Sequence, residues 1–489
     1  MYIVMLSAEC APVAKVGGLA DVIHGLSWQL ELNGHAVEII LPKYDCMRYD
    51  RIEGFSPAYQ GLAVPYYNEW IHCEVFYGVV DGLKCFFIEA RSSHNFFNRG
   101  AIYGQHDDPA RFTFFCRAAL EFMLKTNKHP DVIHCHDWQT GLAPVLLYEM
   151  YFPLGMKHPR ACYTLHNVGH QGVTGDYVLR QAGLHPPNLM RPDKVQDNFN
   201  RAAVNLMKSG IVYSNFVSTV SPRYAHEIKT SPLGMGLQDT FQAHHAKFGG
   251  VLNGLDYQVW NPEFDRHVAC RYSAKNLEDK YKNKDALRSR LWLRNNFKPI
   301  VAVIGRLDHQ KGVELIAQAI PYCLEHGCQF VLLGTSPSPQ VAQRFGHIKH
   351  ILNEHPDCHL ELGYNEELAH QIYAGADMIL IPSVYEPCGL TQMIAMKYGT
   401  VPIVRNTGGL ADTVFDANFA NKPSNERNGY VFNDYNQAGL ESALRRAIGL
   451  WYDYPHLFRE LAVNAMNCDY SWNYPAKHYT NIYNHIMEK

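Results

Sequence analysis

The pentapeptide Gly-Gly-Leu-Ala-Asp occurs twice in the chain, at Gly17–Asp21 and at Gly408–Asp412. Each copy follows a short apolar segment, Tyr2–Leu6 or Val401–Val404, and opens a stretch with helical periodicity. A glycine pair at a helix start lets a ligand approach the backbone, whose first amides carry a partial positive charge. The repeat therefore predicts two αβ units that each present a phosphate or oxyanion site. The alternative is two similar tight turns.

Short apolar runs alternate with helical patterns along the whole chain. Apolar strands joined by helices are typical of parallel sheets that are covered on both faces. A chain of 489 residues is too long for one ordinary core, and the pattern restarts near Pro299 after the charged stretch Asn276–Arg290. We therefore expect an α/β fold with two Rossmann-like, doubly wound domains that face a central cleft. The expected strands are Tyr2–Leu6, Val37–Leu41, Val132–Cys135, Cys162–Leu165, Phe216–Val220, Pro299–Ile304, Phe330–Leu333, Met378–Pro382 and Val401–Val404. The expected helices include Leu19–Leu32, Val313–Cys323, Asn365–Ala374, Thr391–Tyr398, Ala438–Trp451 and Tyr470–Met487.

Domain boundaries follow from the same pattern. We expect a first domain over residues 1–252, a hinge at 253–262 and a second domain over 263–465. The last segment, 466–489, carries Tyr479 and Tyr483 four residues apart in an aromatic-rich helical pattern. This segment is expected to pack back on the first domain. Candidate phosphate-binding groups, such as the two glycine pairs, occur in both halves of the chain. One ligand would therefore contact the groups of both domains only if the hinge closes.

Composition excludes several classes of protein. A net charge of −3 disfavours nucleic acid as the main partner, and no apolar run approaches the roughly 20 residues of a membrane span. The 13 cysteines lack Cys-x-x-Cys spacing, which indicates reduced thiols in a cytosol-like compartment rather than disulfides or zinc. His134 and His136 flank Cys135 on an expected strand, but the spacing does not favour a metal site. The N-terminus runs directly into a strand and resembles no signal or transit peptide.

Basic residues follow the first expected strand of each half. Lys15 directly precedes the first glycine pair. Arg306 and Lys311 lie five residues apart in the turn Gly305–Gly312. Two cations that converge at a helix start suit a diphosphate, because arginine binds oxygens in pairs and lysine acts as a point charge. Surface ion pairs are the alternative.

An acidic residue follows the apolar strand Met378–Pro382. In the segment Tyr385–Thr391, a proline and a glycine form a turn, and a helix is expected to begin at Thr391. The first amides of this helix would hold a terminal phosphate while Glu386 faces the cleft. A carboxylate beside a phosphate suits sugar hydroxyls or a developing cation. A stabilising carboxylate at a helix N-terminus is the alternative.

Two polar clusters end strands in the first half, His134–Trp138 and Thr164–Asn167. His166 could bond a sugar hydroxyl, and Asp137 could orient cations or acceptor hydroxyls. Each cluster is weak evidence by itself, because histidines at strand ends are often structural.

Seven ordered motifs together resemble the bacterial and plant glycogen/starch synthases that use ADP-glucose, and the resemblance spans nearly the whole chain. The segment Leu41–Met47 is more similar to the soluble starch synthases linked to granule initiation, and to their bacterial relatives, than to the enterobacterial type. The seven motifs are Lys15–Asp21 (KVGGLAD), His136–Trp138 (HDW), Thr164–Asn167 (TLHN), Asn253–Asp256 (NGLD), Arg306–Gly312 (RLDHQKG), Glu386–Thr391 (EPCGLT) and Thr407–Asp412 (TGGLAD).

The resemblance implies a GT-B fold and a retaining transfer of glucose from ADP-glucose to the non-reducing end of an α-1,4-glucan. It implies no metal and no other cofactor, and a bacterial cytoplasm or plastid stroma as the compartment. The catalytic set it implies is Glu386, His166, Lys311, Arg306 and Lys15. Diphosphate binding falls to Lys15, Arg306 and Lys311, assisted by Gly17, Gly18 and the amides of Gly389, Leu390 and Thr391. The remaining donor-site residues are His166, Glu386 and Asn253 near the glucose, Tyr364 stacked on adenine, and Asp21, Asp137 and Cys388.

Two departures from the family pattern and two rival functions stay open. Ile394 stands where many retaining GT-B enzymes carry a second glutamate, so other groups must hold the ribose. Gln139 stands where many relatives have histidine. A phosphorylase shares the GT-B fold, but no context for a pyridoxal-phosphate lysine is found. A catalytically silent glucan-binding protein would have no need of cations such as Lys15 and Lys311.

Overall fold

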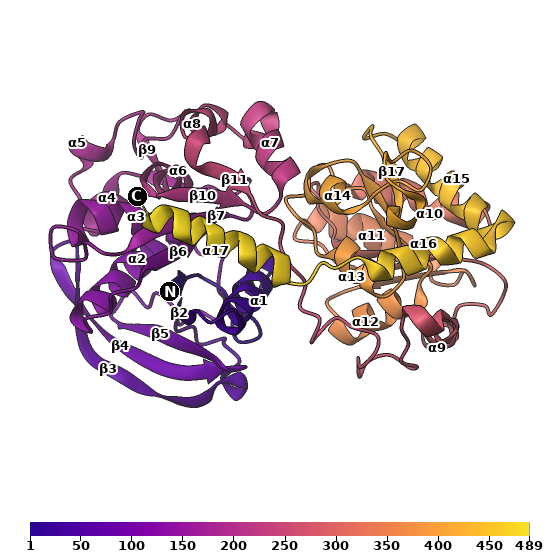
Figure 1. The fold of residues 1–489 in the computed structure, drawn as a ribbon, viewed down its shortest axis with the longest axis horizontal. Coiled ribbons are helices and arrows are strands. Elements are labelled where there is room, and N and C mark those ends of the chain that lie inside the picture. The colour runs from indigo at the N-terminus through magenta and orange to yellow at the C-terminus, as the bar shows by residue number, and fades with distance from the viewer. Residues whose placement is uncertain (489) are drawn as a thin grey trace. The chain divides into compact units, whose positions relative to one another are not determined.

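The computed structural model describes residues 1–488 and contains two compact units (Figure 1). The first comprises Met1–Gly254 together with the segment from Trp472 onward, and the second comprises Leu255–Ser471. The chain therefore passes between the units twice. Lys489, the last residue of the expected C-terminal segment, lies outside the described residues.

The first unit is built on a nine-stranded sheet. Its strands are parallel from β11 through β5, and only β4 and β3 are antiparallel to their neighbours. The chain order reverses between β1 and β6, which creates a topological switch point at their carboxyl ends. In spatial order the strands are β11 (Phe248–Gly250), β10 (Phe216–Thr219), β7 (Arg160–Leu165), β6 (Val132–His136), β1 (Tyr2–Leu6), β2 (Ala36–Pro42), β5 (Leu83–Arg91), β4 (Glu69–Val80) and β3 (Glu53–Tyr66).

Helices cover this sheet, and a small antiparallel pair, β8 (Val173–Gly175) with β9 (Ala203–Asn205), lies outside it. The central parallel strands are apolar because both of their faces are buried; residues Ile3 to Leu6 of β1 have no exposed surface. The helices are α1 (Gly18–Leu32), α2 (Asp108–Lys125), α3 (Ala143–Leu146), α4 (Tyr177–Gln181), α5 (Pro186–Leu189), α6 (Leu206–Tyr213), α7 (Pro222–Thr230), α8 (Gln238–Ala243) and α17 (Asn473–Met487).

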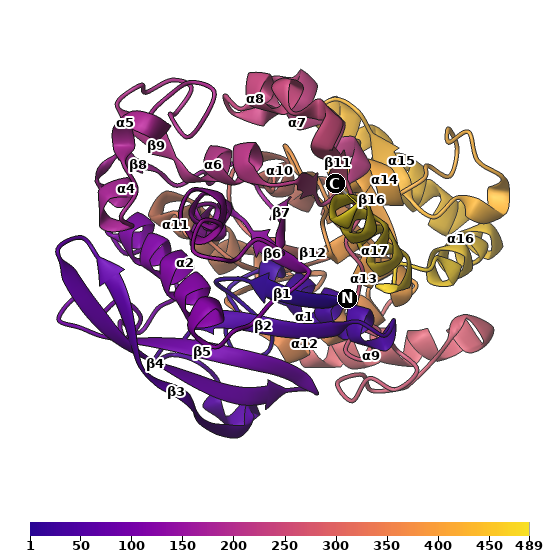
Figure 2. The ribbon, with the colours of Figure 1, turned by 60° about the vertical axis from the view of Figure 1, so that its left-hand side comes forward.

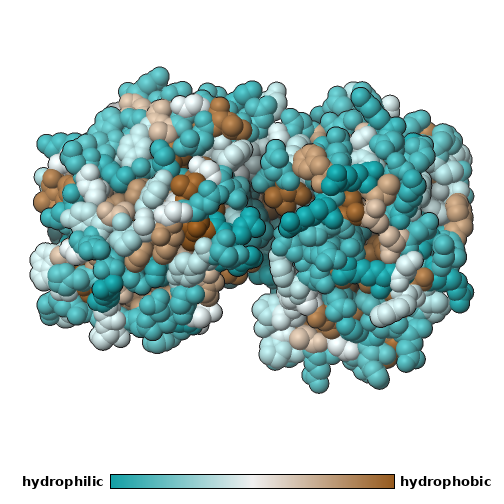
Figure 3. Space-filling view, turned by 90° about the horizontal axis from the view of Figure 1, so that it is seen from below, coloured by the Kyte–Doolittle hydropathy of each residue, from teal (hydrophilic) through white to brown (hydrophobic). Residues whose placement is uncertain are grey.

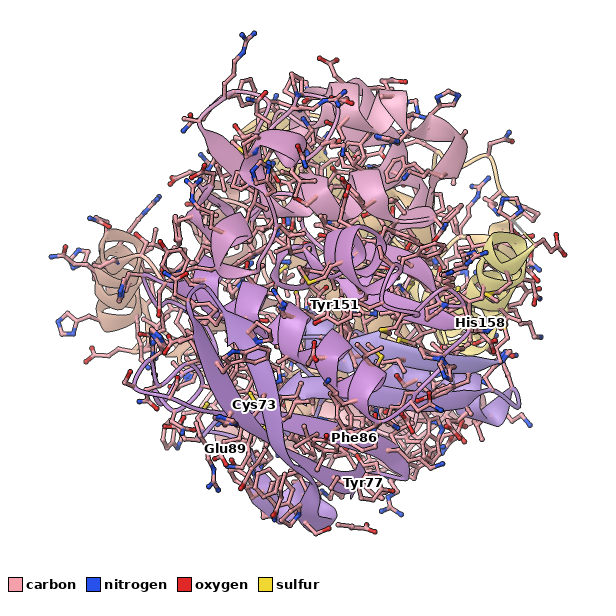
Figure 4. All side chains as sticks on the ribbon, turned by 90° about the vertical axis from the view of Figure 1, so that its left-hand side faces the viewer. Cys73, Tyr77, Phe86, Glu89, Tyr151 and His158 are labelled. Atoms are coloured by element: carbon pink, nitrogen blue, oxygen red, sulfur yellow. The ribbon has the colours of Figure 1, made fainter. Side chains whose placement is uncertain are left out.

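The antiparallel extension β3–β5 was not expected from the sequence. Its hairpin nevertheless carries a readable signal, because Asp81-Gly82 separates two alternating apolar runs and adopts φ of 46° and 88°, as a two-residue hairpin turn requires. The register pairs Tyr77 with Phe86, whose ring centroids lie 5.4 Å apart (Figure 4). Prolines and glycines interrupt β3 and concealed its strand pattern.

The second unit contains a six-stranded sheet in which every strand is parallel to its neighbours. Its order is that of the doubly wound dinucleotide-binding fold, with the switch point between β12 and β15. In spatial order the strands are β14 (Cys358–Leu362), β13 (Gln329–Thr335), β12 (Ile300–Arg306), β15 (Met378–Ile381), β16 (Val401–Arg405) and β17 (Tyr430–Phe432). The helices are α9 (Lys280–Arg290), α10 (Val313–Glu325), α11 (Pro339–Leu352), α12 (Glu366–Gly375), α13 (Thr391–Lys397), α14 (Gly408–Thr413), α15 (Gln437–Asp453) and α16 (Pro455–Asn467).

The predicted α/β class with doubly wound sheets is confirmed. Every expected strand is present, with bounds that agree within two residues, and the six expected helices agree within three. Capping chemistry explains some of this agreement: the Asn365 side chain accepts a hydrogen bond from the Leu368 amide at the start of α12. None of the helices formed by residues 1–488 is both long and apolar enough to cross a membrane. The face shown in Figure 3 is mostly hydrophilic, with scattered hydrophobic residues.

The C-terminal helix α17 belongs to the first unit and packs against α1 (Figure 2). Tyr479 and Tyr483 on this helix have no exposed surface. At the start of the helix, the indole of Trp472 lies directly against Gly25 of α1, where a β-carbon would overlap it. A glycine is therefore required at this crossing.

Gly25→Ala is expected to destabilise the protein by about 1–3 kcal/mol, because Trp472 must move to admit the methyl group. Gly346→Ala is the matched control, since Gly346 lies in helix α11 with nothing within 4 Å of the added carbon. This control should be neutral or stabilising. Denaturant unfolding of both variants measures the difference, and equal stabilities would contradict the packing argument.

Candidate functional site

In the second unit, the structure brings Lys311 and Glu386 together at the switch point of the sheet. Lys311 lies in the turn between β12 and α10, and Glu386 lies in the loop that follows β15. Lys311 Nζ is 2.7 Å from Glu386 Oε2. The sequence predicted both residues at this edge of the sheet but did not predict that they would pair.

The Glu386 carboxylate is nearly buried, with 5% of its side chain exposed, whereas Lys311 keeps 25%. Ser383 Oγ donates to the same Oε2 atom at 2.9 Å. A buried carboxylate requires such partners, because removal from water without them is costly. Lys311 is thus both the counter-ion of Glu386 and a partly exposed cation at the edge of the sheet.

Arg306 and Tyr364 have exposed side chains near the carboxyl ends of two strands of this sheet, β12 and β14. Arg306 is the last residue of β12; its side chain is 52% exposed, and Nη1 is 3.3 Å from Asp308 Oδ2. Tyr364 follows β14, is 76% exposed, and donates its hydroxyl to Glu366 at 3.0 Å. An exposed aromatic ring and an exposed guanidinium suit a flat base and a phosphate.

The loop that carries Cys388 and Gly389 leads into α13, whose first residue is Thr391. Gly389 has φ of 76°, and the Gln392 side chain donates to the carbonyls of Cys388 and Gly389 at 3.0 and 2.8 Å. The amides at a helix start have no partner within the helix. Leu390 and Thr391 stand at this helix start, where the sequence predicts amides for a phosphate, while Cys388 is buried.

The second Gly-Gly-Leu-Ala-Asp copy packs behind this loop. The Gly409 amide donates to the Glu386 carbonyl oxygen at 3.0 Å. A β-carbon on Gly408 would overlap that same oxygen, and one on Gly409 would overlap the Cys388 carbonyl. The expectation that this glycine pair offers its amides to a phosphate is therefore wrong for Gly409, whose amide is already used. The pair instead lets α14 approach the Glu386 loop closely.

In the first unit, Lys15 lies in the loop between β1 and α1, at the switch point of that sheet. Its Nζ atom is 2.7 Å from Asp21 Oδ1, and both side chains are one-third exposed. Gly18, the first residue of α1, is exposed beside them. The structure thus brings together the predicted residues Lys15, Gly18 and Asp21.

Sequence reasoning missed Glu9, which organises this loop. Its Oε2 atom accepts hydrogen bonds from the amides of Val16 and Gly17 at 2.6 and 2.9 Å, and Tyr103 donates to Oε1 at 2.7 Å. Burial raises the pKa of Glu9. The Gly17 amide, predicted to assist a diphosphate, is occupied by a carboxylate in this structure. An acidic residue within an apolar segment just before a glycine pair was the available signal.

Asp137 and His166 lie together beyond the ends of β6 and β7. The His166 amide donates to Asp137 Oδ1 at 2.7 Å. Asp137 has φ of 56° and ψ of 179°, a region used almost only by glycine. Such strain persists only where the surroundings impose it. Burial raises the pKa of the Asp137 carboxyl to about 7.

Asp137→Asn tests this electrostatic cost. A carboxyl whose pKa is raised on folding binds its proton more tightly in the folded state, so wild-type stability falls as pH rises from about 4 to about 7. The asparagine variant lacks this loss, and its stability relative to wild type should rise over that window. Because the Asp137 residue keeps part of its surface exposed to solvent, we expect the difference in unfolding free energy between the two proteins to change by about 1 kcal/mol over this window. Denaturant unfolding at several pH values measures it, and parallel curves would contradict the assignment.

Asn253 closes the first unit near its crossing to the second. It is 5% exposed, and its side-chain oxygen has no hydrogen-bond partner among the described residues. A buried acceptor without a partner costs about 1–3 kcal/mol, so a ligand hydroxyl would fit here. Within residues 1–488 no group of three or more histidine, cysteine or acidic side chains is arranged to hold a metal ion.

Comparison with known proteins identifies both units. Residues 2–243 match the family model of the starch synthase catalytic domain, and residues 289–460 match that of glycosyl transferases group 1. Glycogen synthase 1 of Nitrosococcus oceani is 63% identical over 488 residues, covering all of both chains. Glycogen synthase 2 of Methylococcus capsulatus is 59% identical over 485 residues, covering 99% of this chain and all of that one.

A solved structure agrees with these relatives. The catalytic domain of starch synthase IV from Arabidopsis thaliana, bound to ADP and acarbose, superimposes with a TM-score of 0.97 at 43% identity and covers 100% of this chain and 99% of its own. The family resemblance predicted from the seven motifs is confirmed. The chain belongs to the glycogen and starch synthases, a family of glycosyltransferases with the GT-B fold.

Proposed function

We propose that the chain is a retaining glucosyltransferase that moves glucose from ADP-glucose to the non-reducing end of an α-1,4-glucan. The observation that carries this proposal is the ion pair between the partly exposed Lys311 and the nearly buried Glu386, at the switch point of a doubly wound sheet. A cation suited to a phosphate and a carboxylate suited to sugar hydroxyls lie side by side in this pair, which supports the proposal. The ADP and acarbose bound to the starch synthase IV structure support the same donor and acceptor classes.

We take the proposed roles of the individual residues from the family resemblance. Arg306 and Lys311 bind the donor diphosphate, and Lys15 supplies a further cation. His166, Glu386 and Asn253 contact the glucose. Tyr364 stacks on the adenine. Supporting positions in the proposed donor site are Gly17, Gly18, Asp21, Asp137, Cys388, Gly389, Leu390 and Thr391.

The chemistry follows from charge. As the glucose–phosphate bond breaks, negative charge develops on the leaving ADP and positive charge on the sugar. Fixed cations such as Lys311 and Arg306 stabilise the negative charge on the leaving ADP where it develops. Glu386 offsets the positive charge on the sugar. We favour attack from the same face that ADP leaves, with the departing phosphate accepting the acceptor proton. A covalent intermediate would need a nucleophilic carboxylate on the opposite face.

Incorporation of radiolabelled glucose into a glucan primer tests the proposal, with ADP-glucose and UDP-glucose assayed in parallel. We expect incorporation from ADP-glucose and no cofactor absorbance in the purified protein. Bound pyridoxal phosphate would favour a phosphorylase, and glucan binding without incorporation would favour a silent binding protein. The compartment that we propose from the family resemblance is a bacterial cytoplasm or a plastid stroma, which cell fractionation would test.

EDTA should leave the activity largely intact, changing it by about twofold or less, because protein cations neutralise the diphosphate that a metal would otherwise screen. The measurement is the initial rate with and without chelator, with added Mg²⁺ as the control. Activity that EDTA abolishes and Mg²⁺ or Mn²⁺ restores would contradict this assignment of the cations.

A further inference from the structure

Behind His166 the first unit buries a chain of polar side chains that the proposed reaction does not use. His134 and His136 have no exposed surface, and their rings lie on one side of β6 with centroids 4.1 Å apart and planes tilted by 34°. His134 is held from both ends: Tyr483 Oη of α17 lies 2.8 Å from Nδ1, and Thr164 Oγ1 lies 2.6 Å from Nε2. The C-terminal helix thus fixes the first ring of this histidine pair.

His136 connects this histidine pair to the proposed site. Its Nδ1 atom is 3.1 Å from Nε2 of His166. Its other ring nitrogen, Nε2, is buried and has no hydrogen-bond partner within residues 1–488. Burial lowers the pKa of both imidazoles, that of His166 to about 3, so both rings are neutral near pH 7.

Two neutral imidazoles that face each other nitrogen to nitrogen share one proton in the contact. One nitrogen must donate and the other accept. If His136 carried its proton on Nε2, a buried N–H group would be left without an acceptor, which is rare and costly in proteins. With the proton on Nδ1, Nε2 is an acceptor without a partner, and proteins tolerate a buried unpaired acceptor more often than a buried unpaired donor. The second arrangement is favoured.

We propose that His136 is a positioning residue that fixes the tautomer of His166: it donates from Nδ1 to His166 Nε2, so that His166 carries its own proton on Nδ1. His166 then offers a hydrogen-bond donor, not an acceptor, to a hydroxyl oxygen of the bound sugar. This inference rests on the proposed function for the identity of the ligand, but the tautomer itself is a property of the unliganded protein.

Paired substitutions separate this role from simple packing. In His136→Asn the amide group sits near the position of Nδ1, so a donor toward His166 is kept. In His136→Gln the amide extends to the position of Nε2, and the donor toward His166 is lost. Glutamine fills the space of histidine better than asparagine does. A packing role therefore predicts that the glutamine variant is the better enzyme, and the tautomer role predicts the opposite.

We expect the asparagine variant to retain kcat/KM for ADP-glucose about 10- to 100-fold above that of the glutamine variant, the usual effect of one misdirected buried hydrogen bond. Affinity for ADP, which lacks the sugar, should be the same in both. Tyr483→Phe is the matched control: it removes the hydrogen bond to His134, one step farther from the site. It should lower stability with much less effect on kcat/KM.

The tautomer can be observed directly by nitrogen NMR of the full chain labelled with ¹⁵N-histidine, with His166 assigned from the signal lost in His166→Asn. The expected pattern is a protonated Nδ1 and a bare Nε2 on His166 in the unliganded protein. A proton on Nε2 would overturn the proposal, as would a glutamine variant equal to or better than the asparagine variant. Failure of the wild type to transfer glucose would instead refute the proposed function and leave the NMR result to decide the tautomer.

Discussion

Lys311→Ala is expected to lower kcat/KM for ADP-glucose by about 100- to 1,000-fold, while the protein still folds. Loss of one preorganised charge aimed at the transition state costs a factor of this size. The structure adds a second cause. Lys311 is the counter-ion of Glu386, whose side chain is 5% exposed. Its removal leaves a buried carboxylate with the Ser383 hydroxyl as its side-chain hydrogen-bond donor. Steady-state kinetics and unfolding measurements together check the expectation.

Lys349→Ala provides the matched control. Lys349 belongs to the same unit, its side chain is 34% exposed, and it also pairs with a glutamate, with 3.5 Å between Nζ and Glu361. It lies in α11, away from the switch point between β12 and β15, so its loss should change kcat/KM by about twofold or less. Arg306→Ala should cost roughly 30-fold or more through the diphosphate. Near-normal turnover by both Lys311→Ala and Arg306→Ala would refute the phosphate assignment.

Much of the fold was predictable because buried parallel strands are continuously apolar. Tyr2–Leu6 and Val401–Val404 stand out in the sequence for this reason, and the topology rule then places the residues that follow them at a functional edge. The antiparallel β3–β5 extension was not predicted, since its strands are half-exposed and interrupted by proline and glycine. The Asp81-Gly82 turn between β4 and β5 shows that part of the signal was present.

The candidate site was predictable only where single residue types carry the chemistry. Lys311 and Glu386 could be identified from their charges after apolar strands. Glu9 and His136 could not, because their importance depends on which atoms the fold brings to them: two loop amides for Glu9 and a second imidazole for His136. A buried donor or acceptor acquires its role from its partner, and one sequence without the fold does not identify partners that lie far away along the chain.

The repeated pentapeptide gives the sharpest case of this limit, because the same five residues have different surroundings in the two units. Gly408 has φ of 45°, and a β-carbon there would overlap the Glu386 carbonyl oxygen. Gly17 has φ of −148°, and nothing lies within 4 Å of an added carbon. Identical substitutions should therefore have unequal effects on stability.

Gly408→Ala is expected to destabilise the protein by about 3 kcal/mol or more, because left-handed strain adds to a clash with backbone that cannot rotate away. Gly17→Ala should change stability by about 0.5 kcal/mol or less. Denaturant unfolding of the two variants compares them directly. The clash at Gly408 is with the residue that carries the site carboxylate, so kcat should fall even at temperatures where the variant remains folded. Equal stabilities would mean that α14 does not hold the Glu386 loop, and that the second glycine pair needs another explanation.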